Sequence, residues 1–265
     1  MLKTRTLTAL AGIPVLLFFA YLGGYWYGAL LLAISLVGVK EYFALVRKGG
    51  WNPFDMAGYL FIPLGLFAVF QGNLLLIIIL WMLFFASLSL FPIFSSGKVK
   101  YWESAVTFWG IVYNGGPAGF LLSIRFMEDG FILTIFLFLA IWASDVFAYI
   151  VGGKLGKRLL APKISPKKTV EGAVAGLVGS TLAGFLLMFF APLPYIEWPQ
   201  GALLGFLCGL SGMLGDLSQS AMKRSVGAKD SGDLLPGHGG ILDRFDSLFF
   251  AAPFFYIYLH YLTMV

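Results

Sequence analysis

The sequence predicts an all-α, polytopic membrane protein with about nine transmembrane helices. Of its 265 residues, 59% are hydrophobic and only 12% are charged, and the mean hydropathy is +0.87. A soluble globular domain does not need that much apolar surface, so this composition excludes the common soluble classes. Two further observations predict the fold: the number of apolar stretches, and the placement of basic residues between them.

Nine stretches of the chain are apolar over about the length that a membrane requires. A spanning helix needs roughly 20 predominantly apolar residues. The stretches are residues 6–22, 25–46, 55–71, 73–91, 103–126, 131–153, 170–192, 200–224 and 240–262. We expect each of them to form one helix.

The basic residues fall almost entirely on one side of these stretches. If the N-terminus is cytoplasmic and the chain alternates, 17 of the 18 Lys and Arg residues are cytoplasmic and only Arg125 lies outside. Cytoplasmic loops carry an excess of Lys and Arg, and a wrong helix count would scramble this asymmetry. We therefore expect the N-terminus inside, the C-terminus outside, and a multi-pass protein of the cell inner (cytoplasmic) membrane.

The residues capable of chemistry are concentrated in the second half of the chain. We divide the sequence into N-terminal scaffold helices, 1–130, and a region with the candidate catalytic residues, 131–265, whose cytoplasmic loops are 154–169 and 225–240. The scaffold is expected to give access for lipid and dimer contacts. Glycines recur every four residues from Gly201, and small residues at this spacing predict close helix packing in lipid. They allow a homodimer without requiring one.

The most polar segment runs from Asp216 to Asp246. Five carboxylates, four basic residues and one of the two histidines fall within it, although apolar residues surround it in the sequence. Hydrocarbon does not solvate such groups, so water, a metal or an anionic ligand must satisfy them. Asp216, Ser220 and Lys223 share one helix face, and Asp243 lies three residues from Asp246 on another.

Acidic residues from three predicted helices lie at similar depths in the membrane. Counted from the cytoplasmic helix ends, Asp145 and Asp216 are roughly 12 Å deep, Asp246 roughly 9 Å and Asp243 roughly 5 Å. A charge inside a spanning helix costs about 2.5–3.5 kcal/mol. A structural ion pair would explain one such acid, whereas a polar cavity open to the cytoplasm explains all four.

The residue types available restrict the kind of metal site. With two histidines and one cysteine in the chain, only carboxylates can supply a set of ligands. Converging carboxylates repel one another unless a cation lies between them. Mg²⁺, with phosphate oxygens completing its shell, suits such a site.

The loop at 154–168 contains six basic residues and no acid. On charge alone, an ordinary loop against anionic lipid head groups explains it. Ser165 and Pro166 have the form of a helix N-cap followed by proline at the first helical position. Lys167 and Lys168 would then lie in the first helical turn, where a docked anion would explain two cations.

Two runs of residues resemble a known family. SAMKRSVGAKDSGDLLPGHGGILDRFD, residues 220–246, closely resembles the signature of phosphatidate cytidylyltransferases, also called CDP-diacylglycerol synthases. SPKKTVEG, residues 165–172, resembles a second motif of that family. The first 130 residues resemble the family only in hydropathy.

The resemblance implies Mg²⁺-dependent condensation of CTP with phosphatidic acid, giving CDP-diacylglycerol and pyrophosphate. Its partners would be CTP, phosphatidic acid and membrane lipid, with no nucleic acid, and a second cation beside Mg²⁺ stays open. The metal ligands implied are Asp216, Asp243 and Asp246, which would be catalytic together with Lys223 and Arg244. The substrate-binding residues implied are Ser165, Lys167, Lys168, Lys223, Arg224, Lys229, His238, Asp145 and Tyr149.

The sequence leaves two alternative functions open. A CTP-dependent lipid-alcohol kinase would share the nucleotide and metal residues but transfer the γ-phosphoryl group. An anion transporter would also need charges within the membrane, but at its midplane rather than near the cytoplasmic side.

Overall fold

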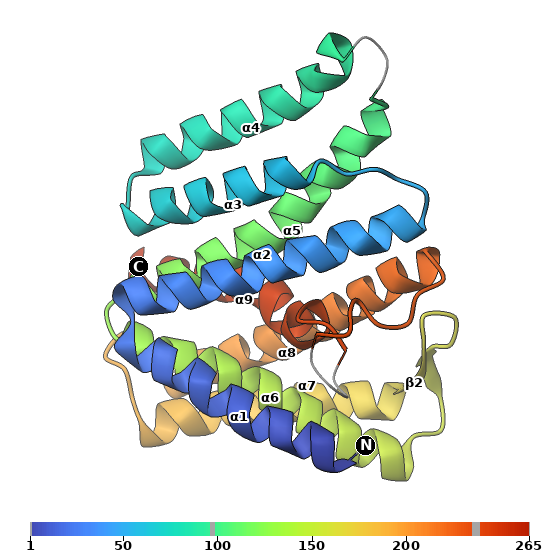
Figure 1. The fold of residues 1–265 in the computed structure, drawn as a ribbon. Coiled ribbons are helices and arrows are strands. Elements are labelled where there is room, and N and C mark those ends of the chain that lie inside the picture. Colours follow the sequence, from blue (N-terminus) through green and yellow to red (C-terminus); the bar gives the residue numbers. More distant parts are fainter. Residues whose placement is uncertain (1, 96–98, 235–238, 265) are drawn as a thin grey trace. The chain divides into compact units, whose positions relative to one another are not determined.

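The computed structural model describes residues 2–95, 99–234 and 239–264, which form nine α-helices and one pair of short β-strands (Figure 1). The helices are α1 (Leu2–Leu22), α2 (Gly24–Lys48), α3 (Asp55–Phe70), α4 (Leu74–Phe94), α5 (Tyr101–Phe126), α6 (Gly130–Leu155), α7 (Val170–Phe190), α8 (Trp198–Ser225) and α9 (Leu242–Met264), and the strands are β1 (Leu159–Ala161) and β2 (Ser165–Thr169). Each predicted apolar stretch coincides with one helix. The fold class is therefore confirmed as nearly all-α.

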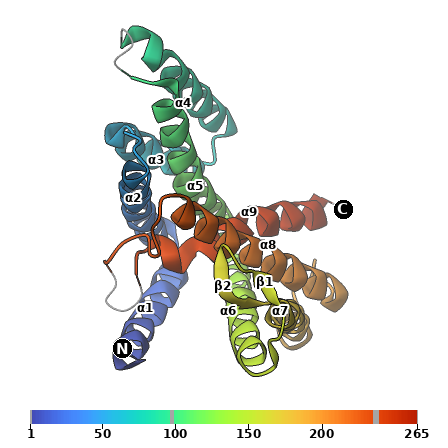
Figure 2. The ribbon, with the colours of Figure 1, turned by 90° about the vertical axis from the view of Figure 1, so that its right-hand side faces the viewer.

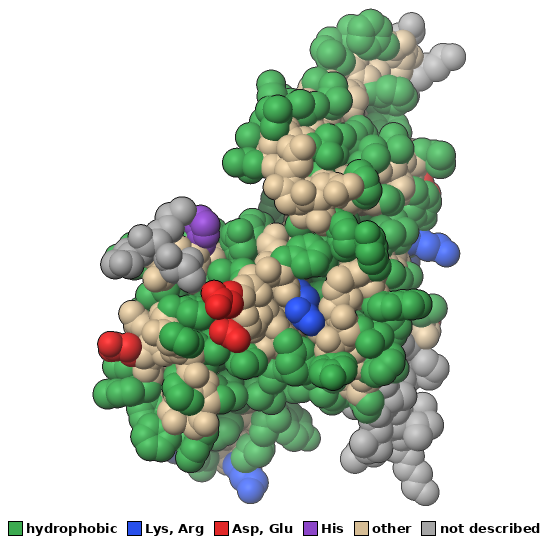
Figure 3. All heavy atoms as spheres, turned by 90° about the vertical axis from the view of Figure 1, so that its left-hand side faces the viewer, with side chains coloured by type: hydrophobic (Ala, Val, Ile, Leu, Met, Phe, Trp, Pro, Cys, Tyr) green, Lys and Arg blue, Asp and Glu red, His purple; other side chains and the backbone are tan. Residues whose placement is uncertain are grey.

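Several helices have the length and composition of membrane spans. Within the described residues, α2, α4, α6, α7 and α8 are long and apolar enough to cross a bilayer. Figure 3 shows one face of the molecule, on which hydrophobic side chains predominate and charged ones are few. The chain is thus a multi-pass membrane protein. The count of nine spans and the orientation of the termini stay predictions.

The chain divides into two compact units. One comprises residues 1–126 and 225–244, and the other comprises residues 127–224 and 245–265. The segment 225–244, which the sequence division assigns to the second half, thus groups with the N-terminal helices. Helix α9 is continuous, although its first turn belongs to one unit and its remainder to the other.

The first unit is built around α2, α3 and α5, with α4 packed on α3 and α5, and α1 on α2. Its buried side chains include Tyr27, Phe43, Ile62 and Leu121. Arg125 contacts the C-terminal end of α1. It is the one basic residue that the charge asymmetry places outside. Its Nε donates to the Ala20 carbonyl oxygen at 2.7 Å and its Nη2 to that of Tyr21 at 3.1 Å, so it caps carbonyls that lack a helical partner.

Glycines bring the helices of the second unit close together. A Cβ at Gly176 of α7 would meet Ser144 of α6, and one at Gly184 of α7 would meet the backbone of Gly201 and Gly205 on α8. These contacts confirm the close packing that the glycine spacing predicts. Because the faces are occupied within the chain, they give no support to a homodimer.

A β-hairpin joins α6 to α7, and the sequence did not predict it (Figure 2). β1 pairs antiparallel with β2, so the expected N-cap at Ser165 and first turn at Lys167 and Lys168 are wrong. α7 begins after Thr169, whose Oγ1 accepts the Gly172 N–H at 3.2 Å. Threonine serves both roles, because β-branched residues favour strands and its hydroxyl caps helices.

Glu171, in the first turn of α7, ties the hairpin to the helix. Its carboxylate accepts the backbone N–H groups of Lys157 and Arg158 at 3.0–3.3 Å. The acid thus lies at the positive end of the helix dipole while holding the start of the hairpin in place.

The packing of α7 on α8 can be tested at Gly205. An added Cβ would collide with the Ser180 carbonyl oxygen, a backbone atom that cannot rotate away. Gly205→Ala should therefore lower the free energy of unfolding by about 1–3 kcal/mol. Gly116→Ala in α5, where a Cβ meets nothing within 4 Å, is the control and should stay within about 1 kcal/mol of wild type. Thermal unfolding in detergent measures both, and equal midpoints for the two variants would contradict the account.

Candidate functional site

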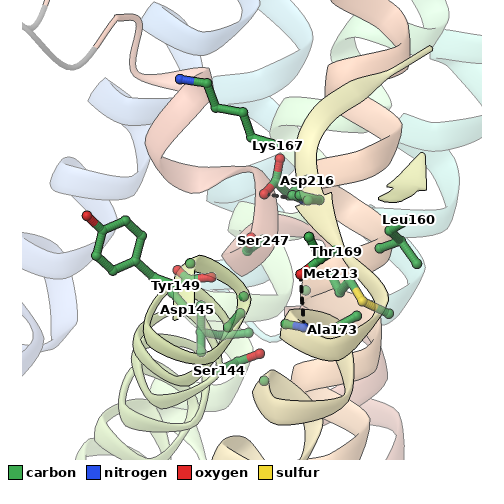
Figure 4. A pocket seen from close by; sticks show the side chains of 18 residues that line it. Ser144, Asp145, Tyr149, Leu160, Lys167, Thr169, Ala173, Met213, Asp216 and Ser247 are labelled. Carbon is green, nitrogen blue, oxygen red and sulfur yellow. Dashed lines mark hydrogen bonds and ion pairs between the residues drawn. The ribbon is translucent and has the colours of Figure 1, made fainter. Parts of the chain in front are cut away.

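The second unit contains a cavity of about 500 Å³ between α6, α7, α8 and the hairpin. Five side chains that the sequence predicted as site residues line it: Asp145 and Tyr149 from α6, Lys167 and Lys168 from β2, and Asp216 from α8 (Figure 4). These residues lie as far as 71 positions apart in the chain. The structure brings them together because glycines at the cavity wall let α6, α7 and α8 approach closely.

An ion pair crosses the cavity. The Lys168 Nζ lies 2.5 Å from the Asp216 Oδ2, and the two side chains are 27% and 33% exposed. Ser220, one turn further along α8, donates its hydroxyl to the Asp216 Oδ1 at 3.3 Å. Lys168 thus contacts its anionic partner, Asp216, from a β-strand. Its position does not depend on an anion bound at a helix N-terminus, as the sequence had suggested.

Lys167 and Tyr149 lie at the open side of the cavity. Figure 4 shows the Lys167 side chain directed away from Asp216. Successive side chains of a strand point to opposite faces, which separates Lys167 from Lys168. Tyr149 is 84% exposed. An anion in the cavity would therefore meet Lys168 at its inner wall and Lys167 nearer its mouth.

Asp246, on α9, adds an acid from a third helix beside those on α6 and α8. It is only 8% exposed, and its Oδ1 accepts the Ser247 N–H at 2.7 Å. It is close enough for Asp216 and Asp145 to repel it and for Lys223 to offset part of that repulsion. Ser247 itself lines the cavity. Asp145, Asp216 and Asp246, three of the four acids that the sequence placed at similar depths, thus lie near one another.

This set of donors fits a magnesium ion that arrives with a phosphate ligand. Within residues 2–95, 99–234 and 239–264, no three His, Cys, Asp or Glu side chains form a ligand cluster by themselves. Mg²⁺ in proteins commonly takes one or two carboxylates and completes its octahedron with water and substrate phosphates. Asp216 and Asp246 meet that requirement. The third predicted ligand, Asp243, accepts hydrogen bonds from Ser231 and Gly240 instead.

Arg224 connects α8 to the hairpin. Its Nε donates to the Ile164 carbonyl oxygen at 3.3 Å, in the turn between β1 and β2. Ser165 begins β2 and pairs with Ala161. These two predicted substrate-binding residues therefore have structural contacts at the hairpin, and Lys223, one residue before Arg224, is buried.

The other predicted site residues belong to the segment 225–244 of the first unit. Asp243 Oδ2 accepts three hydrogen bonds, from the Ser231 N–H at 2.8 Å, the Ser231 hydroxyl at 3.0 Å and the Gly240 N–H at 3.0 Å. These contacts show that Asp243 organises the loop, and its role as a metal ligand stays a prediction. Lys229 and Arg244 are exposed. His238 lies outside the described residues.

Sequence reasoning missed Glu41 on α2. This carboxylate is 8% exposed and accepts hydrogen bonds from Ser231, Ile241 and Leu242 at 2.9–3.1 Å. A signal was available, because an ionisable residue inside an apolar helix is by default a candidate functional residue.

Known proteins are similar to this chain over nearly its whole length. Residues 3–262 match the model of the Cytidylyltransferase family. A phosphatidate cytidylyltransferase of Synechocystis sp. is 38% identical, over 96% of this chain and 95% of that protein. Proteins of the same name from Staphylococcus haemolyticus and Staphylococcus epidermidis are 32% and 33% identical, each over 97% of this chain and 99% of the relative.

The burial of Asp246, together with repulsion from Asp216 and Asp145, predicts a gain in stability when its charge is removed. Asp246→Asn keeps the acceptor for the Ser247 N–H but removes a buried charge that Asp216 and Asp145 oppose. Without divalent cations, the variant should be more stable than wild type by about 1 kcal/mol, as is common when a strained functional group is replaced. Chemical unfolding in EDTA measures this.

The control for that measurement is Asp233→Asn, at an exposed acid of the loop, which should change stability by less than about 0.5 kcal/mol. If Asp246→Asn were instead less stable than wild type, an attractive ion pair would dominate at Asp246 and the convergence of repelling acids would be refuted.

Proposed function

This chain belongs to the cytidylyltransferase family, and from that premise we propose that the cavity beside Lys168 and Asp216 binds CTP and phosphatidic acid. The reaction that the family and the relatives support is transfer of the cytidylyl group of CTP to phosphatidic acid, giving CDP-diacylglycerol and pyrophosphate. We assign the reaction to this cavity because acids from α6, α8 and α9 lie there beside basic side chains of the hairpin.

The proposed orientation gives both substrates access. We propose that all nine helices cross the cytoplasmic membrane, with the N-terminus inside. Seventeen of the 18 Lys and Arg residues then lie on the cytoplasmic side, in agreement with the positive-inside rule. The cavity would lie within the cytoplasmic leaflet, so that CTP reaches it from the cytoplasm and the lipid head group from the leaflet.

Asp216 and Asp246 would hold Mg²⁺, with water and phosphate oxygens as its remaining ligands. When bound, the ion would supply positive charge to the triphosphate, where negative charge develops as pyrophosphate leaves. Asp243 is kept as a third candidate ligand. A divalent ion also explains why three acids lie together in a partly dehydrated place.

The basic side chains would bind and orient the two anionic substrates. Lys168, paired with Asp216 at the inner wall, would contact one phosphate, and Lys167, which points away from Asp216, would contact a phosphate nearer the mouth. Lys223, Arg224 and Lys229 are candidates for the remaining phosphate oxygens. Such positioning accounts for much of the catalysis of phosphoryl transfer.

The bond changes need no strong general base. A phosphate oxygen of phosphatidic acid forms a bond to the α-phosphorus of CTP, while the bond from that phosphorus to the oxygen bridging it to the β-phosphorus breaks. Pyrophosphate takes the electron pair. A phosphate monoester is already largely ionised at neutral pH. His238 is therefore expected to contact phosphate or the loop, and proton abstraction is not assigned to it.

Labelled substrate tests this function and separates it from its alternatives. Purified protein is supplied with Mg²⁺, phosphatidic acid and CTP labelled at the α-phosphorus. Label in a CDP-lipid supports the proposal. Label in CDP would indicate a kinase, and solute flux without turnover would indicate a carrier.

In that assay, Asp246→Asn should abolish turnover, because the amide is a neutral and poorer ligand for Mg²⁺. Its folding is checked by unfolding in detergent, and Asp233→Asn is the matched control that should keep wild-type activity. Wild-type turnover by Asp246→Asn would remove Asp246 from the metal site.

Lys167→Ala should raise the Michaelis constant for one phosphate-bearing substrate by about tenfold, the loss of one charge-assisted contact. Lys163→Ala, an exposed lysine of the same loop, is the control that should leave both constants unchanged. If the two variants had equal effects, general attraction of the loop to an anionic membrane surface would explain Lys167.

A further inference from the structure

We propose that Glu41 of α2 is a positioning residue for cytidylyl transfer, because it fastens the loop between α8 and α9, described at residues 226–234 and 239–241, to the first turn of α9. The inference rests on the function proposed above. It gives the N-terminal helices, to which the sequence assigned no site residue, a part in the reaction that acts through the loop and α9. Glu41 itself need not touch a substrate.

The contacts of Glu41 join Ser231, within the loop, to the end of the loop and the start of α9. Its Oε1 accepts the Ile241 N–H at 2.9 Å, and its Oε2 accepts the Leu242 N–H at 3.0 Å and lies 3.1 Å from the Ser231 hydroxyl. Backbone N–H groups at the start of a helix have no partner within it. A carboxylate from another helix therefore caps α9, where the helix dipole also favours negative charge.

Glycines of the loop leave room for this carboxylate. A Cβ at Gly232 would meet the Glu41 Oε1, and a Cβ at Gly240 would collide with the Glu41 Oε2 and the Ser231 hydroxyl. Gly239 has a φ of +79°, and a Cβ there would meet the Asp243 Oδ2. The backbone at the end of the loop thus wraps closely around two carboxylates, which side chains at these positions would prevent.

Ser231 links Glu41 to Asp243. Its hydroxyl lies 3.1 Å from the Glu41 Oε2 and 3.0 Å from the Asp243 Oδ2, and its N–H donates to that same Asp243 oxygen. A serine hydroxyl has one hydrogen, so it serves one of the two carboxylates at a time. Any displacement of Glu41 therefore reaches a predicted catalytic residue through one intervening side chain.

The connectivity of the chain explains how this fastening reaches the reaction. The loop leaves α8 just after Lys223 and Arg224, carries the exposed Lys229, and enters α9 just before Asp243. α9 is a continuous helix, so a displacement of its first turn also displaces the next turn, which carries Asp246. Loosening the loop should therefore disturb the binding of a phosphate more than the stability of the fold.

The test uses the full-length protein in detergent with lipid, and three variants. Glu41→Gln places an amide against backbone donors, because one oxygen becomes an NH₂ group. Ser231→Ala removes the hydroxyl between the two carboxylates. Glu103→Gln is the matched control, since Glu103 also accepts an N–H at a helix start, that of Lys100 at 3.0 Å, but does not contact the loop.

Glu41→Gln should raise the Michaelis constant for CTP or phosphatidic acid about tenfold, as expected when a charge-assisted hydrogen bond is lost, while Glu103→Gln leaves both constants unchanged. A purely structural role would lower the active fraction and kcat but not these constants. The double variant Glu41→Gln/Ser231→Ala should be no worse than Glu41→Gln alone, because both changes break one network. Trypsin should also cleave after Lys229 faster in Glu41→Gln than in wild type.

Two results would overturn the inference: unchanged Michaelis constants for both substrates, or a cleavage rate equal to that of wild type. Absence of CDP-lipid with the wild-type protein would instead refute the proposed function, and it is recognised before any variant is compared. If Glu41→Gln does not fold, Ser231→Ala decides, because the same rise in a Michaelis constant is expected of it.

Discussion

A charge inside an apolar helix bundle must be compensated, and here the pairing of Lys168 with Asp216 provides that compensation at 2.5 Å. The two residues come from different elements, so the pairing fixes the hairpin on α8. Thr169 and Glu171 complete the arrangement, because they end the strand and begin α7 within three residues. The hairpin and the start of α7 thus hold one lysine opposite one aspartate.

Close helix packing makes that convergence possible. Gly176 and Gly184 have no side chains to separate α7 from α6 and α8, so the helix backbones approach closely. Carboxylates on separate helices therefore lie near the same cavity. Burial and the nearby Asp216 and Asp145 oppose a charge on Asp246, and Lys223 offsets only part of that cost. Sites of this kind are less stable than their surroundings because function requires charge that the bound ligand, rather than the protein, neutralises.

The helices could be predicted from the sequence because length, hydropathy and the placement of Lys and Arg are properties of the local chain. The convergence of Asp145, Asp216 and Asp246 could also be predicted, since depth along a helix follows from counting residues. The hairpin could not, because SPKKT satisfies the rules for a helix start as well as those for a strand, and its pairing partner lies outside the motif. Glu41 was missed because its partners are about 190 residues away and its role appears only once the loop is folded.

In the proposed reaction, acids of separate helices share one magnesium ion with the nucleotide. Electron–nuclear double resonance of protein loaded with Mn²⁺ in place of Mg²⁺ tests it most directly, with CTP present. The account predicts a ³¹P coupling from a metal-bound phosphate, and loss of the protein-bound signal in both Asp216→Asn and Asp246→Asn. Bound Mn²⁺ that shows no phosphorus coupling, or that persists in both variants, would contradict it.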